Sequence, residues 1–163
     1  MALIRNYNHM KHYIIDGNNL IGKLDSLKKM QQKDKQHSRE KLASMVDNHF
    51  SGKKLKITIH FDGFENLPIK LNSLKIVYSD NKSADEKIKK QIELSKNRKN
   101  LVVITSDNNI LEFARVCSSG IMKSEEFLTM IKRKEVDDEK NIIDKMKNDT
   151  EEWKKLFEQN EDQ

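Results

Sequence analysis

The sequence of 163 residues contains one cysteine, one proline and five glycines, and aromatic residues make up only 6% of it. Because Cys117 is the single cysteine, no disulfide can form within the chain, and a reducing, cytoplasmic location is the default expectation. The scarcity of proline and glycine excludes a flexible linker rich in these residues. No internal repeat is present either.

Long apolar runs are also missing. None approaches the ~20 residues that a membrane-spanning helix needs, and the polar stretch 1–11 has no apolar core of a signal peptide. We therefore expect no membrane contact. Shorter apolar stretches recur with a clear period, which favours a folded body over disorder. The length fits one compact domain with an appendage.

Charge is abundant but unevenly distributed, with a formal net charge of +5. Residues 133–163 hold 7 Lys/Arg against 11 Asp/Glu, whereas residues 1–132 hold 24 against 15. The basic body suggests a polyanionic partner such as nucleic acid, and a lysine-rich solvated surface explains the same charge equally well.

Strand-like and helix-like segments alternate along the body. Strands are expected at 12–15, 55–61, 74–78 and 101–104, with a short last strand at 121–122. Helices are expected at 34–50, from Ser83, after Asp107 and from Ser124. The apolar run 101–104 does not alternate, which is typical of a parallel strand buried on both faces. This order predicts an α/β sandwich with a mostly parallel sheet.

The last part of the chain has a different pattern. Ile143, Met146, Trp153 and Phe157 are spaced as one apolar stripe of a helix that is otherwise charged. We expect a folded body at 1–132 and a charged, amphipathic helical tail at 133–163. The stripe could pack on the body, pair with a second copy or bind a partner, so the oligomeric state stays open.

Four aspartates occupy similar positions in the expected fold. Asp16, Asp62 and Asp107 each follow a strand, and Asp85 lies in the first turn of the helix after the third strand. The carboxyl ends of parallel strands share one edge of the sheet. Carboxylates gathered there repel one another, and a divalent cation removes that penalty. Mg²⁺ prefers oxygen ligands, and two such ions can activate water against a phosphodiester.

Each aspartate alone has an ordinary explanation. Asp107 could be a helix N-cap, Asp85 a favourable acid in a first turn, and Asp16 and Asp62 turn residues before glycine. Their occurrence together at one expected edge favours a metal site.

Five short motifs in order resemble a known family, the YacP-like branch of NYN domains. They are DGNNLIG at 16–22, FDG at 61–63, SADEKI at 83–88, TSD at 105–107, and Gly120 followed by SEEFL at 124–128. The resemblance covers about residues 12–132. It implies a three-layer α/β/α PIN-like sandwich, here with a C-terminal helical extension. Members are similar to PIN domains and flap endonucleases, which cut RNA or DNA with Mg²⁺ or Mn²⁺, and bacterial YacP-like proteins are associated with mRNA cleavage on ribosomes.

The resemblance also implies roles for individual residues. Asp16, Asp85 and Asp107 would be catalytic, metal-binding carboxylates, with Asp62 as a fourth candidate. Asn19 would orient a ligand beside Asp16. Further substrate contacts are expected from Thr105 and Ser106 and from a set of bases: Lys23, Lys82, Lys87, Lys89, Lys90 and Arg115.

Three positions depart from the family pattern. Asn18 replaces the usual aromatic residue, Lys82 stands where relatives often carry an acid, and Ser83 replaces a threonine. The lysine would change the metal affinity or contact a phosphate. No departure removes one of the four aspartates.

Other readings of these motifs fit less well. Gly17 to Lys23 has the spacing of a P-loop, but Leu24 stands where Ser or Thr should hold Mg²⁺. Asn18 occupies the second acid position of an Asp-x-Asp phosphatase, and the adjacent acid pair of a receiver domain is absent. Two hypotheses remain: a metal-dependent endoribonuclease, and a catalytically weak RNA- or ribosome-binding module with the same fold.

Overall fold

The computed structural model describes residues 10–71 and 73–160, with side chains described up to residue 155. Most of the polar N-terminal stretch and the side chain of Phe157 therefore lie outside the described part. One sheet contains β1 (His12–Asp16), β2 (Lys56–Phe61), β3 (Lys75–Tyr78), β4 (Leu101–Ile104) and β5 (Gly120–Met122). The strand order is β3-β2-β1-β4-β5, and every neighbouring pair is parallel.

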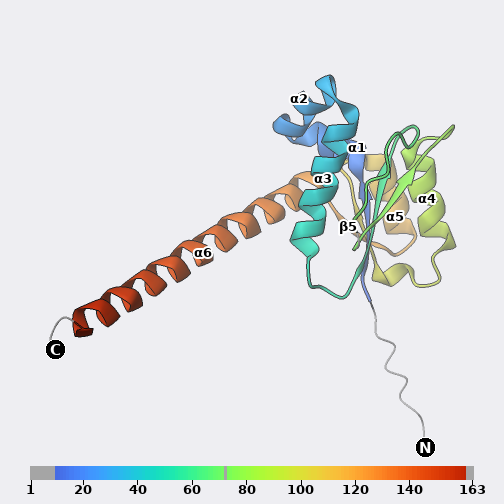
Figure 1. Cartoon of the computed structure of the whole chain (residues 1–163). Coiled ribbons are helices and arrows are strands. Elements are labelled where there is room, and N and C mark those ends of the chain that lie inside the picture. The colour runs from blue at the N-terminus through green and yellow to red at the C-terminus, as the bar shows by residue number, and fades with distance from the viewer. Residues whose placement is uncertain (1–9, 72, 161–163) are drawn as a thin grey trace, which may run out of the picture. The chain divides into compact units, whose positions relative to one another are not determined.

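Helices cover both faces of this sheet. The helices α1 (Gly17–Lys23), α2 (Asp25–Lys33) and α3 (Lys35–Phe50) lie on one side, and α4 (Ala84–Leu94) and α5 (Asn108–Val116) lie on the other (Figure 1). A 3₁₀ turn, Arg98–Asn100, precedes β4, and α6 (Ser124–Asn160) follows β5. The predicted three-layer α/β/α sandwich is confirmed. Sequence reasoning missed α1 and α2, which lie in a segment left without an assigned element.

The central strand β1 connects the two outer layers through alternate side chains. The Tyr13 ring packs against Phe50 of α3, with ring centroids 4.8 Å apart. Ile14 points to the other face and joins a buried cluster with Ile88 of α4 and Ile110 of α5. Both faces of β1 are therefore covered, which fixes the position of Asp16 at the end of this strand.

Three helices begin close to the carboxyl edge of the sheet, each with a side-chain cap. Asp16 caps α1 by accepting from the Asn19 amide at 3.1 Å. Ser83 caps α4. Asp107 caps α5, and its Oδ1 accepts from the amides of Asn109 at 2.8 Å and Ile110 at 3.2 Å. The structure therefore confirms that Asp107 is a helix cap. The cap also holds the Asp107 carboxylate at the edge of the sheet, so it is compatible with a metal site there.

Gly17 lies where α1 approaches β2 too closely for a side chain. A Cβ at this position would lie 2.4 Å from the Phe61 ring and 2.9 Å from the His60 carbonyl oxygen. Phe61 is fully buried, so it has little room to move. We expect Gly17→Ala to lower the free energy of unfolding by about 1–3 kcal/mol, measured by urea denaturation. Gly22→Ala, which meets nothing within 4 Å, is the control; an equal loss in both variants would contradict this account.

The chain divides by its contacts into Met1–Leu128 and Thr129–Gln163. The second unit is helical as predicted, and the expected boundary at 132/133 falls inside α6. Ile143, Met146 and Trp153 each expose half or more of their side chains. The predicted packing of this stripe on the body, a second copy or a partner stays a prediction. Within the described residues, no helix combines the length and the apolar character required to cross a bilayer.

Candidate active site

Asp16 ends β1 and is 5% exposed. Its two carboxylate oxygens have separate partners: Oδ1 accepts from the Asn19 amide and Oδ2 accepts from the Thr105 hydroxyl at 2.9 Å. The pKa of Asp16 is raised to about 6, mainly by burial and to a smaller extent by Asp85 and Asp62, while those two hydrogen bonds lower it. The carboxylate is therefore fixed in position, and its charged form is destabilised.

Asp62 brings the start of α4 to the same edge. Its Oδ1 accepts from the Ala84 amide at 2.8 Å, which places the next residue, Asp85, beside the ends of β1 and β2. Burial, followed by Asp107 and Asp62, raises the pKa of the half-buried Asp85, while Lys89 opposes the shift. Like charges thus act on Asp85 from both sides of the edge.

Thr105 joins the ends of β1 and β4. Its fully buried hydroxyl donates to Asp16 and accepts from the Asp107 amide at 3.1 Å. These two strands lie where the chain reverses its direction across the sheet, at the position where open α/β sheets form their binding crevices. One hydroxyl therefore sets the relative position of two of the predicted catalytic aspartates.

All four predicted aspartates lie at this edge; Asp85 and Asp62 act electrostatically on Asp16, and Asp107 and Asp62 act on Asp85. Within residues 10–71 and 73–160, however, no three carboxylate, imidazole or thiol side chains are grouped closely enough to form a ready-made metal site. The donors themselves suit Mg²⁺ or Mn²⁺, which bind a few carboxylate oxygens and complete their shells with water. The residues present therefore fit such an ion.

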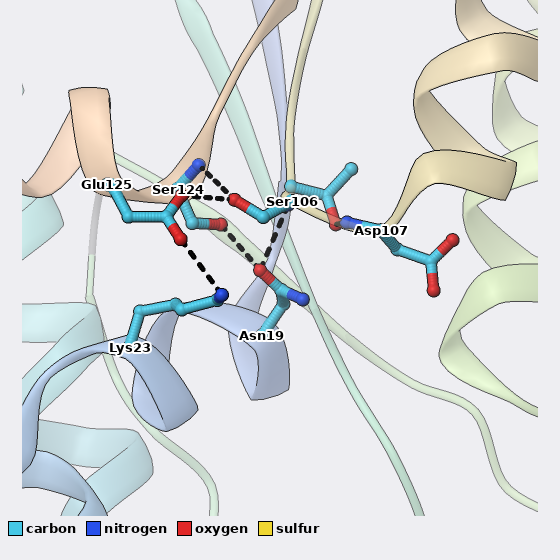
Figure 2. Close-up of polar contacts among 7 residues, drawn as sticks. Asn19, Lys23, Ser106, Asp107, Ser124 and Glu125 are labelled. Atoms are coloured by element: carbon cyan, nitrogen blue, oxygen red, sulfur yellow. Dashed lines mark hydrogen bonds and ion pairs between the residues drawn. The ribbon is translucent and has the colours of Figure 1, made fainter.

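A second polar network lies beside the aspartates (Figure 2). Asn19 Oδ1 accepts from the Ser106 amide at 3.0 Å and from the Ser124 hydroxyl at 2.7 Å. The Ser124 amide donates to Ser106 Oγ at 3.1 Å, and that hydroxyl donates to the Glu125 carboxylate. The network connects α1, the end of β4 and the start of α6. The predicted substrate groups Asn19 and Ser106 thus use their oxygens within the fold, while the Asn19 amide nitrogen points away from Ser124.

The predicted phosphate-binding bases occupy different surroundings. Lys23 forms an ion pair with Glu125 at 2.9 Å. Hydrogen bonds from Lys23 and Ser106 hold the pKa of Glu125 at about 2, so the charge of Lys23 is balanced within the protein. Arg115 lies in the last turn of α5, about 12 Å along the helix from Asp107. Lys82 is exposed in the loop before α4, three residues ahead of Asp85.

Sequence reasoning missed three side chains at this edge. Glu125 was overlooked, although two acids in the first turn of a helix after the last strand are visible in the sequence. Arg39 of α3 donates to the Asp62 carbonyl at 2.7 Å, and Asn18 Oδ1 accepts from the Asp62 amide at 3.1 Å. These two contacts hold the Asp62 loop, and no local pattern indicates partners so distant in sequence.

We expect Asn19→Ala to lower the free energy of unfolding by about 2 kcal/mol, because it leaves the buried Ser124 hydroxyl and the Ser106 amide without their acceptor. Asn109→Ala, at an exposed position of α5, should change stability by less than about 0.5 kcal/mol. Urea denaturation of both variants checks this. Equal losses would show that the network contributes nothing specific.

Comparison with known proteins adds a family and a fold. The sequence profile of the YacP-like NYN domain family matches residues 13–163. The crystal structure of Rae1 (YacP) from Bacillus subtilis is 22% identical, with a TM-score of 0.69 over 82% of this chain and 80% of that one. A substituted variant of the same protein is also 22% identical, with a TM-score of 0.68 over 80% of each chain. At this identity the likeness concerns the fold. No protein with a curated description matches.

Proposed function

Because the chain belongs to the YacP-like NYN domain family, a PIN-like family that supports an RNase-type function, we propose that it is a Mg²⁺- or Mn²⁺-dependent endoribonuclease. The observation that carries the proposal is the position of Asp16, Asp62, Asp85 and Asp107 at one edge, where burial and then neighbouring carboxylates raise the pKa values of Asp16 and Asp85. Carboxylates in such a position are costly without a cation. A cation site is the function that accounts for all four.

The aspartates would hold the metal in distinct ways. Asp16 is the fixed ligand, because both of its oxygens are oriented by Asn19 and Thr105. Asp85 and Asp107 are half-buried and can adjust toward an ion. A bound divalent ion supplies a more acidic water and neutralises the charge that develops on a phosphodiester. The network around Asn19 and Ser124 keeps the surrounding strand ends in place.

Substrate binding would rely on fewer bases than the sequence indicates. Lys82 is one candidate cation, since it is exposed directly before the Ser83 cap of α4. Lys89 is another, since it acts electrostatically on Asp85. The Asn19 amide nitrogen is a further group that can reach a phosphate oxygen. Lys23 would act on substrate only if its ion pair with Glu125 opened. RNA is the implied substrate of the family.

The rival function is a catalytically weak RNA- or ribosome-binding module. A surface selected only to bind a polyanion gains nothing from four acids at one edge, because they repel phosphates. The raised pKa of the buried Asp16 is a stability cost that a purely structural role does not require. The four acids at this edge therefore favour catalysis.

The experiment is a cleavage assay with purified protein. Single-stranded RNA, structured RNA and a DNA of the same sequence are incubated with Mg²⁺, with Mn²⁺ and with excess EDTA. We expect internal cuts in RNA with either metal and none in EDTA. Cleavage that continues unchanged in EDTA would contradict a metal mechanism, and binding of RNA without any cleavage would support the module.

A finer version of the proposal concerns translated mRNA. Family members are associated with cleavage on ribosomes, so the same assay should include an mRNA in an in vitro translation reaction. Cuts that appear only during translation would identify the ribosome-bound message as the substrate. Equal cutting of naked and translated mRNA would exclude a requirement for the ribosome.

A further inference from the structure

A cleft of about 430 Å³ lies between α4 and the strands β1 to β3. Its wall includes His12, the first residue of β1, so it extends toward the amino ends of the strands, whereas the four aspartates lie at their carboxyl ends. The volume falls in the range of small-ligand sites. None of the predicted catalytic aspartates lines it, and the function proposed above does not use it.

Basic side chains dominate the charge of this cleft. Lys75 from β3 and Lys87 and Lys90 from α4 line it, and no acid is among its lining residues in the described part of the chain. Lys87 also pairs with Asp80 at 3.5 Å. Lys75 and Lys90 are exposed, so their ammonium groups can turn toward a ligand without disturbing the core. The cleft is therefore complementary to an anion.

The inner wall of the cleft is polar and ordered. His12 Nε2 lies 2.8 Å from the Thr58 hydroxyl, and the Gln91 amide donates to the same hydroxyl at 3.2 Å. Gln91 Oε1 lies 2.6 Å from His60 Nε2. Burial, then Lys56 and Lys75, lowers the pKa of His12, so its ring is neutral at pH 7. The wall thus adds hydrogen-bonding groups without adding charge.

Apolar side chains complete the cleft. Val77 and Leu101 line it from the sheet, and Leu94 lines it from the last turn of α4. Leu94 is 71% exposed, so its apolar surface is open to a ligand. Leu101 is already buried, so a planar aromatic ligand would remove apolar surface from water mainly at Leu94 and Val77. Anion-binding and ring-binding surfaces therefore lie side by side.

We propose that this cleft binds one nucleotide unit, with its phosphate on Lys75 and Lys90 and its base against Leu94. A simple anion would use only the lysines, and an acidic peptide would leave the apolar side chains unused. The nucleotide could be free, or it could belong to an RNA held away from the cleaved bond. The second source rests on the ribonuclease function proposed above; the first does not.

The test is calorimetry on the full chain in EDTA, so that no cleavage occurs. The probes are adenosine 5′-monophosphate, inorganic phosphate and a ten-nucleotide RNA. The variant Lys75→Ala/Lys90→Ala is compared with Lys29→Ala/Lys41→Ala, which removes two exposed lysines from α2 and α3 on the other side of the sheet. We expect the cleft variant to bind the nucleotide at least about tenfold more weakly, and the control to change by less than about twofold.

A second pair of variants tests the base. Leu94→Ser should weaken binding of the nucleotide about threefold or more without affecting inorganic phosphate, because only the nucleotide carries a ring. Leu67→Ser, at another exposed leucine, is the control. Changes in the imidazole NMR signals of His12 on adding nucleotide would locate the ligand in the cleft.

The outcomes distinguish a free nucleotide from a nucleotide of RNA, and they distinguish binding in the cleft from the proposed RNA cleavage. If the free nucleotide fails to bind but RNA binding falls tenfold in the cleft variant alone, the site holds a nucleotide of RNA. If the two lysine pairs affect both probes equally, the proposal is overturned. Asp16→Asn should still bind the nucleotide in the cleft. Loss of cleavage in Asp16→Asn therefore tests the ribonuclease proposal, and loss of binding in the cleft variant tests the nucleotide-site proposal.

Discussion

Replacing Asp16 or Asp107 with asparagine is expected to lower the rate of metal-dependent RNA cleavage by about 10²–10³-fold. Each change removes a charged oxygen ligand of the metal while keeping the shape of the side chain. The rate falls because a bound metal contributes several kcal/mol to the stabilisation of the transition state. Asp107→Asn should still cap α5, because asparagine caps helices as well as aspartate does. The measurement is initial cleavage rate at saturating Mn²⁺, with circular dichroism to verify the fold.

Asp34→Asn is the matched control for these variants. Asp34 caps α3 by accepting from the His37 amide at 3.0 Å, so it has the same local role as Asp107 without belonging to the acidic edge. Its cleavage rate should stay within about twofold of the unsubstituted protein. If Asp107→Asn and Asp34→Asn behaved alike, Asp107 would be only a helix cap.

The contribution of Asp16 to the stability of the metal-free protein is expected to fall as the pH rises from about 4.5 to 7. The folded-state pKa of Asp16 is about 6, above its ordinary value of 3.8. Between these values the folded state binds more protons than the unfolded state, so a rise in pH favours unfolding. This single group contributes about 2 kcal/mol across that range. Asp85, whose pKa is also raised, acts in the same direction.

Comparison with Asp16→Asn isolates this effect. The variant cannot titrate at residue 16, so the stability difference between the two proteins should change by about 2 kcal/mol between pH 4.5 and 7. Mg²⁺ added at pH 7 should raise the urea midpoint of the unsubstituted protein more than that of the variant. A stability difference that is constant with pH would mean that Asp16 is not a high-pKa carboxyl.

Much of the fold could be predicted because its signals are local. The run at 101–104 indicated a buried parallel strand, and in β4 Val103 and Ile104 are fully buried. Parallel pairing then brings the strand ends to one edge, so the positions of Asp16, Asp62 and Asp107 followed from three short patterns. Asp85 followed from the helix start at Ser83, which the structure confirms as the cap of α4.

The parts that escaped prediction depend on contacts between distant residues. The helix α1 has seven residues and begins with glycine, so it shows neither the length nor the period of a helix. A local cap from Asp16 and the close tertiary approach of Gly17 to β2 define it instead. Lys23 was expected to bind phosphate, but the sequence does not reveal that α6 places Glu125 beside it.

The edge combines two requirements that are otherwise in conflict. A metal site needs several carboxylates together, and the fold must remain stable when no ion is bound. Hydrogen bonds from Thr105 and the Asn19 amide to Asp16 oppose the effect of burial on its pKa. The uncharged Asn19–Ser106–Ser124 network holds the neighbouring strand ends without adding negative charge. We infer that these hydrogen bonds and the uncharged network together let the acidic edge form before the ion binds.

Crystals soaked in Mn²⁺ provide the most direct measurement of the central claim, because Mn²⁺ scatters anomalously and can be located without assuming its ligands. The account predicts an anomalous peak bound by Asp16 together with Asp85 or Asp107, and no peak there in Asp16→Asn crystals. A fully soaked crystal with no peak at this edge, or with manganese only elsewhere on the molecule, would contradict it.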